Sequence, residues 1–217
     1  MHGRGPARAP SKPSSRMPAT DDEIREKYLE RAIRELNSLT HEVQTCELCP
    51  RGSMMPVLGS GHPQADVLLL KYAPRPSEIE EGVAFYGRAG SALMKSFKRL
   101  AIDPLVVYGT VFVKCPVSDT EDSAPECRAR VLEEIAIVMP RIVVVMGEEA
   151  RVELNELRIP MARELEPRRG EVQRLTPSCE ALVVPDIDSA LDEEGAKRSF
   201  WKAFRALGDW YADLPPY

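Results

Sequence analysis

Four short apolar runs, each linked to the next through helix-forming segments, constrain the fold of this chain more than any other feature. The runs occupy residues 67–72, 106–114, 142–146 and 181–184 of the 217-residue sequence. A short, almost wholly apolar run is typical of a strand that is covered on both faces. Strands alternating with helices predict an α/β fold, here three α/β/α layers around a central, mostly parallel four-stranded sheet.

The remaining segments predict helices, loops and one tail. Apolar residues at helical spacing predict helices over residues 21–46, 88–101, 125–139, 148–157 and roughly 193–212. Residues 1–20 are rich in Pro, Ser, Gly and Arg, which predicts a disordered basic arm. We expect residues 21–217 to form a single domain.

Composition narrows the class of protein. No apolar run approaches the roughly 20 residues of a membrane span, and the first residues contain no apolar core of a secretion signal. We therefore expect a cytoplasmic protein with no membrane partner. The net charge of −5 predicts no broad basic face, so any binding to nucleic acid is expected to be of modest affinity.

Four of the five cysteines form two spaced pairs, Cys46-x2-Cys49 and Cys115-x11-Cys127. Disulfides are rare in the cytosol, so cysteines gathered there are more often metal ligands or catalytic groups. Four thiolates hold zinc in a tetrahedral site or anchor a [4Fe–4S] cluster. The spacing alone favours neither of these. Cys179 is left over and is expected to be a thiol without a role in the site.

Motifs at the predicted strand ends resemble those of one known family. The chain contains CELC at 46–49, KYAPRPSEIEEGVAFYGRAG at 71–90, FVKC at 112–115, PECRARVLEEI at 125–135 and MPRIVVVMGEEA at 139–150. As a set, they resemble the iron–sulfur branch, called family 4, of the uracil-DNA glycosylase superfamily. The resemblance covers about residues 40–200. It implies a uracil-DNA glycosylase-like fold, a role in DNA repair, and a [4Fe–4S] cluster, rather than zinc, on the four paired cysteines.

The resemblance also implies where a base would bind. Phe85 stands where family 4 enzymes place a ring that stacks on a flipped-out uracil, and such stacking restores roughly 1–3 kcal/mol per base. Tyr72, Ala73 and Glu78 complete the expected base-binding residues, with Glu78 at an acidic position of the first motif. Without the resemblance, Phe85 is interpreted as a core residue and Glu78 as part of a solvated acidic turn.

Three pocket positions depart from the family pattern. Tyr72 replaces an acidic residue that positions the attacking water, and Lys71 replaces the glycine before it. Val111 replaces an Asn that reads the uracil edge, and Ile187 replaces a His that stabilises the departing uracil. Hydrolysis of an N-glycosidic bond needs a placed nucleophile and charge stabilisation on the leaving base. We therefore expect weak or absent uracil excision and assign no catalytic residue.

Three functions remain open at this point. The first is a repair-related protein that binds DNA, single-stranded or uracil-containing, through a degenerate pocket. The second is an active glycosylase, a hydrolase of N-glycosyl bonds, that acts on another lesion and uses Tyr72, Glu78 or Asp188. The third is a non-catalytic scaffold for a protein partner. We expect a monomer in each case.

Overall fold

The computed structural model describes residues 20–214. The predicted basic arm lies outside the described residues except for Thr20. This residue caps the first helix, because its hydroxyl accepts a hydrogen bond from the Glu23 amide and the Glu23 carboxylate accepts one from the Thr20 amide. Among the described residues, no helix combines the length and the apolar character that crossing a bilayer requires.

The sheet has four parallel strands at its centre: β2 (Val67–Lys71), β3 (Val107–Val111), β4 (Ile142–Met146) and β6 (Glu180–Val184). These are the four predicted strands. The sheet nevertheless has six strands, in the order β1-β3-β2-β4-β6-β5, so the predicted number of four is wrong. The additional strands β1 (Ser60–Gly61) and β5 (Val172–Arg174) pair antiparallel at the two edges. They are too short, and too polar, to produce an apolar run.

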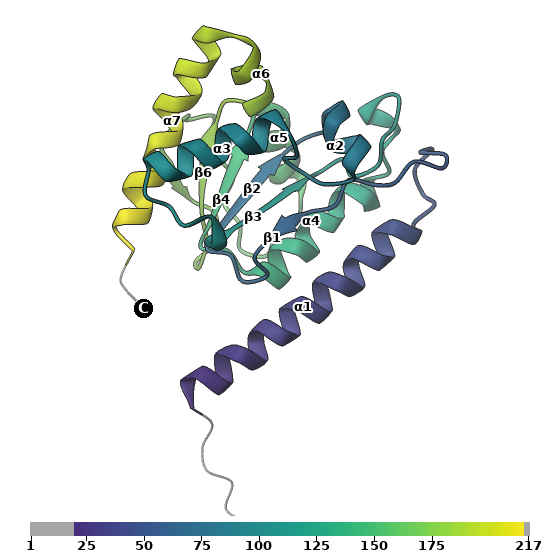
Figure 1. The fold of residues 1–217 in the computed structure, drawn as a ribbon, viewed down its shortest axis with the longest axis horizontal. Helices are drawn as coiled ribbons and strands as arrows, with labels where there is room; N and C mark the ends of the chain where they lie inside the picture. The colour runs from purple at the N-terminus through teal and green to yellow at the C-terminus, as the bar shows by residue number, and fades with distance from the viewer. Residues whose placement is uncertain (1–19, 215–217) are drawn as a thin grey trace, which may run out of the picture.

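Helices cover both faces of the sheet and confirm the α/β class (Figure 1). One face packs against α3 (Arg88–Arg99), α6 (Ile187–Asp192) and α7 (Glu194–Ala212). The other packs against α4 (Pro125–Val138) and α5 (Glu148–Glu156), and α1 (Asp21–Thr45) lies along α4. The six-residue helices α2 (Pro76–Glu81) and α6 were not predicted, because they are too short to show helical periodicity.

The alternation of side chains along β2 positions the candidate site. Val67 and Leu69 belong to the core on the α3 and α7 face, whereas Leu68 and Leu70 belong to the core on the α4 and α5 face. Successive strand residues point to opposite faces. Lys71, at the carboxyl end of the strand, therefore falls on the α3 and α7 face.

Candidate functional site

Lys71 lies at the carboxyl end of β2 with no exposed surface. In the parallel ladder, Val111 of β3 lies on one side and Met146 of β4 on the other. Two carboxylates hold the ammonium: Nζ is 2.6 Å from Glu78 Oε2 and 2.8 Å from Asp188 Oδ2. A buried lysine is tolerated in an apolar setting only when carboxylates pair with it in this way.

Glu78 accepts more hydrogen bonds than the other carboxylate of this site. It lies in α2 and is 1% exposed, so its interpretation as part of a solvated turn is wrong. Besides binding Lys71, Glu78 accepts a hydrogen bond from the Arg75 amide at 2.6 Å and another from the Phe85 amide. Through these bonds Glu78 connects the start of α2, the strand end and the turn that carries Phe85.

Phe85 occupies an unusual backbone position, with φ at 60°. Left-handed backbone is uncommon for a bulky residue, and the hydrogen bond from its amide to Glu78 holds it there. Its ring packs against Gly109 of β3, where a Cβ atom would come within 2.6 Å of the ring. Lys71 Nζ lies over the ring, 5.4 Å from its centroid. We name Lys71, Glu78, Phe85 and Asp188 the strand-end cluster.

The other predicted pocket residues lie around this cluster. Tyr72 packs toward the opposite face of the sheet, with its ring 6.5 Å from that of Phe112, and Ala73 is half-buried beyond it. Val111 and Ile187 are buried core residues on the cluster's face of the sheet. The sequence analysis assigned no role to Lys71 and named Asp188 only as a residue that an altered glycosylase could use. The only sequence signal for the buried pair was a lysine directly after an apolar run, followed seven residues later by Glu78.

A small pocket of about 410 Å³ opens beside the strand-end cluster, and we call it the mouth pocket. Residues of α2, α3 and α6 line it. Asp192 of α6 binds Arg75 at 3.0 Å and Arg88 at 3.1 Å, so ion pairs join these helices across the pocket. The Arg75 guanidinium is also 4.0 Å from Asp188. These pairs hold α6, and with it Asp188, against the end of β2.

Three of the four predicted metal ligands come together elsewhere at the carboxyl end of the sheet. The ligand atoms of Cys49, Cys115 and Cys127 lie within 4.8 Å of one another, and all three residues are buried. We call them the cysteine trio. Cys49 follows α1, Cys115 follows β3, and Cys127 lies in the first turn of α4. Cys46 is half-buried and is not part of this group.

The trio has the chemistry of a ligand set for a soft metal. The Sγ atoms of Cys115 and Cys127 lie 3.9 Å apart, and their mutual hydrogen bond lowers the pKa of Cys127 and raises that of Cys115. Thiolate is the form that binds metal. By contrast, burial raises the pKa of the Cys179 thiol to about 12, on the far side of the sheet from the strand-end cluster.

The loop that carries Cys46 is tied down close to the trio. Arg51 donates hydrogen bonds to the Gln44 carbonyl at 2.7 Å, to the Cys46 carbonyl at 3.0 Å, and to the Met54 carbonyl. Cys46 therefore lies at the end of α1, three residues before a member of the trio, in a loop of defined path. Its position in the chain makes it the candidate for a fourth ligand.

Comparison with known proteins places the fold and these motifs in a family. A family model, the Uracil DNA glycosylase superfamily, matches residues 58–207, which is more than half of the chain. The chain belongs to this superfamily. The match includes the whole central sheet and the strand-end cluster, and it confirms the resemblance noted in the sequence.

Curated relatives of this superfamily member carry the name type-4 uracil-DNA glycosylase. The protein of Sulfurisphaera tokodaii is 31% identical over 124 residues, which is 53% of this chain and 56% of the relative. That of Pyrobaculum aerophilum is 29% identical over 145 residues, 63% of this chain and 73% of the relative. That of Archaeoglobus fulgidus is 20% identical over 186 residues, 82% and 94% of the two chains. The chain thus spans about half the length of the first of these relatives.

Proposed function

We propose that this chain is a DNA-binding member of the uracil-DNA glycosylase superfamily in which the Lys71 side chain occupies the base slot, so that uracil excision is weak or absent. One observation carries the proposal: the Lys71 ammonium lies over the Phe85 ring and is bound by Glu78 and Asp188. If Phe85 is the stacking platform that the family resemblance implies, a flipped-out base cannot reach it without displacing this lysine.

The chemistry around Phe85 supports the same conclusion. Excision of uracil places negative charge on the departing base, and stabilising that charge is a large part of the catalytic effect. The strand-end cluster contains two carboxylates and one ammonium, so its excess of negative charge opposes an anion. Val111 and Ile187 offer no polar atom in their side chains, and both are buried. Losing one electrostatic stabiliser commonly costs about 10²–10³ in rate.

The proposed partner and cofactor follow from the relatives and from the cysteine trio. The relatives are named as uracil-DNA glycosylases, and we propose that this chain binds DNA, single-stranded or uracil-containing, as a monomeric domain of residues 21–217. The trio, with Cys46 as the fourth ligand, would hold a [4Fe–4S] cluster, and zinc is the alternative. Bound there, either would cross-link the N-terminal loop, the end of β3 and α4.

A uracil-release assay tests the occupied slot. The full chain is incubated with a single-stranded oligonucleotide containing one uracil, and free uracil is measured. We expect no release above that of a sample without protein. Robust release that Phe85→Ala abolishes would overturn the proposal.

A binding assay tests the role of Lys71 directly. Lys71→Gly restores the residue that the family pattern has at this position, and we expect it to bind free uracil where the unaltered chain shows no binding. Lys27→Gly, an exposed change on α1, is the matched control and is expected to bind none. Circular dichroism checks that Lys71→Gly is folded, because the change removes the cation that pairs with Glu78 and Asp188. Equal uracil binding by the unaltered chain and folded Lys71→Gly would show that Lys71 does not fill the slot.

An active glycosylase with another lesion specificity is the second candidate. The Glu78 and Asp188 carboxylates beside Phe85 favour it, since a carboxylate can orient or activate a water molecule. A screen of oligonucleotides with deaminated and alkylated bases separates the two candidates. Release of one modified base, lost in Asp188→Asn, would support this second function.

A further inference from the structure

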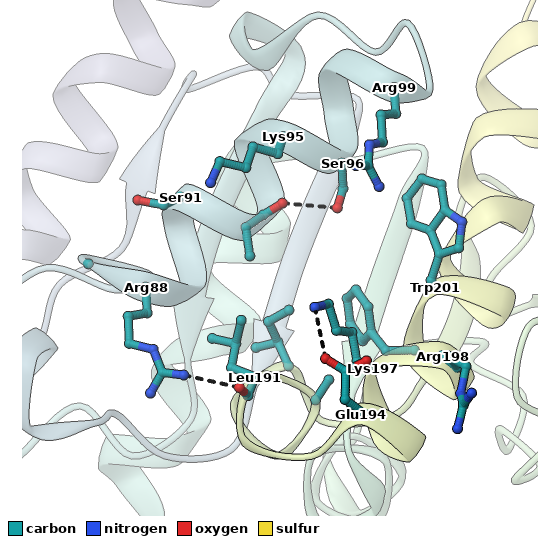
Figure 2. Close-up of a pocket in the computed structure, with 15 residues that line it drawn as sticks. Arg88, Ser91, Lys95, Ser96, Arg99, Leu191, Glu194, Lys197, Arg198 and Trp201 are labelled. Atoms are coloured by element: carbon teal, nitrogen blue, oxygen red, sulfur yellow. Dashed lines mark hydrogen bonds and ion pairs between the residues drawn. The ribbon is translucent and has the colours of Figure 1, made fainter.

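A groove lies beside the strand-end cluster, between α3 on one wall and α6 and α7 on the other. Its volume is about 860 Å³, and we call it the α3–α7 groove. No residue of the strand-end cluster lines this groove. Figure 2 shows its two walls: Arg99 points from α3 toward the Trp201 ring, and Lys197 reaches from α7 into the space between the helices.

The lining of the groove is strongly cationic, although the chain as a whole has a net charge of −5. Its charged lining residues are Arg88, Lys95, Arg99, Lys197, Arg198 and a single carboxylate, Glu194. Helix α3 alone contributes three of these cations and contains no Asp or Glu. In the part of the chain that the structure describes, Lys95, Arg99 and Arg198 form no ion pair. Lys197 pairs with Glu194 at 3.3 Å (Figure 2), but both side chains are largely exposed, so this contact is weak and a phosphate can replace it. The positive charge is therefore available to an anionic ligand.

The groove also offers an apolar and aromatic surface. Ile187, Ala190, Leu191 and Phe200 contribute to the lining from α6 and α7. Trp201 is half-buried, and the Arg99 guanidinium lies over its ring, 5.7 Å from the centroid. A cationic groove that contains an aromatic ring fits single-stranded nucleic acid, because phosphates pair with the cations and unpaired bases stack on the ring.

We propose that the α3–α7 groove binds a single strand of nucleic acid, with phosphates on Arg99 and Lys197 and a base against Trp201. The strand is single because a duplex keeps the faces of its bases stacked inside and cannot present them to the apolar wall. The proposal deepens the proposed DNA binding and rests on it, but it does not depend on Lys71 filling the base slot.

Arg88 gives the strand a route from this groove to the base slot. It lines both the α3–α7 groove and the mouth pocket. Its guanidinium donates to the Leu191 carbonyl at 3.0 Å and pairs with Asp192 at 3.1 Å, so it lies where the two hollows meet. A nucleic-acid strand held in the groove thus passes the mouth pocket, while its bases stay outside the base slot at Phe85.

Binding of fluorescein-labelled oligothymidylate to the full chain, followed by fluorescence anisotropy over a range of salt concentrations, tests the charges. Arg99→Gln with Lys197→Gln is expected to weaken binding about tenfold at low salt. It should also reduce the slope of log affinity against log salt by about 1.4, at roughly 0.7 per phosphate contact. The control is Arg25→Gln with Lys27→Gln, which removes the same charge from an exposed part of α1. It is expected to bind as the unaltered chain does.

Trp201 fluorescence tests the stacking. We expect oligothymidylate to quench the tryptophan emission of the unaltered chain, and Trp201→Phe to abolish most of the quenching while it keeps binding within a few-fold. Trp210 is the internal reference, because it does not line the groove. Its indole N–H donates to the Glu180 carboxylate at 2.5 Å. Trp201→Ala, which removes the ring, is expected to weaken binding roughly fivefold or more.

The proposal would be overturned by equal affinity of the Arg99/Lys197 variant and its control, by no quenching on binding, or by no binding of oligothymidylate at all. Displacement of the oligonucleotide by a polyglutamate peptide of equal charge would also overturn it and assign the groove to an acidic protein. The two proposals fail separately. Uracil release by the unaltered chain would refute the filled slot only, whereas normal binding by the groove variant would refute the groove only.

Discussion

At the scale of single residues, Lys71 decides what the strand end can do. A lysine with no exposed surface is stable there because Glu78 and Asp188 surround its ammonium. Removing one partner of a buried ion pair leaves a charge without compensation, which costs far more than the pair contributes. The strand-end cluster thus contains the side chain that we propose fills the base slot, and it also belongs to a part of the fold that tolerates little change.

Glu78→Gln is expected to lower the free energy of unfolding by about 3 kcal/mol, at the lower end of the loss for a broken buried pair. The amide removes the negative charge and leaves one oxygen for the Lys71, Arg75 and Phe85 donors that Glu78 now serves. Urea unfolding followed by circular dichroism measures the change.

Glu80→Gln is the matched control, since Glu80 lies two residues along the same helix and is exposed. It is expected to stay within about 0.5 kcal/mol of the unaltered chain. An equal loss in the two variants would show that Glu78 contributes no more than a surface carboxylate.

At the scale of elements, the turn after α2 and the strand β3 meet where Gly109 receives the Phe85 ring. Strand β3 runs through Gly109 without a break, although glycine is uncommon inside a strand. The glycine provides space: a Cβ atom there would lie 2.6 Å and 3.0 Å from two ring carbons of Phe85. The packing of one helix–turn unit on one strand therefore depends on a missing side chain.

Gly109→Ala is expected to destabilise the protein by about 1–3 kcal/mol, because the Phe85 ring has to shift from a position that Glu78 holds. Thermal or urea unfolding measures this loss. Gly195→Ala is the same substitution where the added Cβ meets nothing within 4 Å, near the start of α7. We expect no loss there, since alanine favours a helix over glycine. Equal stability of the two variants would contradict the packing argument.

At the scale of the whole molecule, the cysteine trio joins segments that lie far apart in the chain. It draws Cys49, Cys115 and Cys127 from the N-terminal loop, the end of a central strand and the start of α4. A metal bound by groups from separate segments contributes its binding free energy to folding. The same end of the molecule that carries the proposed base slot would then depend on the metal for its stability.

Iron, sulfide and the ultraviolet–visible spectrum of anaerobically purified protein test the centre. We expect iron and sulfide, a broad brown absorbance, and loss of all three in Cys127→Ser, with a lower unfolding midpoint. Cys46→Ser is expected to lower the iron content as well if Cys46 supplies the fourth ligand. Cys179→Ser is the control and should keep the iron. Zinc without iron would establish the alternative metal, and neither metal would refute the centre.

The sequence by itself determined the α/β class, the four parallel strands, the five longer helices and the family, because each follows from local periodicity or from a contiguous motif. The family resemblance also predicted that Cys49, Cys115 and Cys127 come together, as three of four metal ligands. Short elements such as β1, β5, α2 and α6 could not be predicted, since two to six residues show no periodicity. The number of strands was wrong for this reason.

Only the tertiary structure decided the chemistry of the strand end and the existence of the groove. Lys71 and Asp188 lie 117 positions apart in the sequence, and the groove needs α3 and α7 on the same face of the sheet. Without the family resemblance, the sequence indicated that Glu78 belongs to a solvated turn, because a run of glutamates is usually exposed, whereas the fold buries it against Lys71. Such pairings depend on which segments the fold brings together, and local patterns carry no information about that.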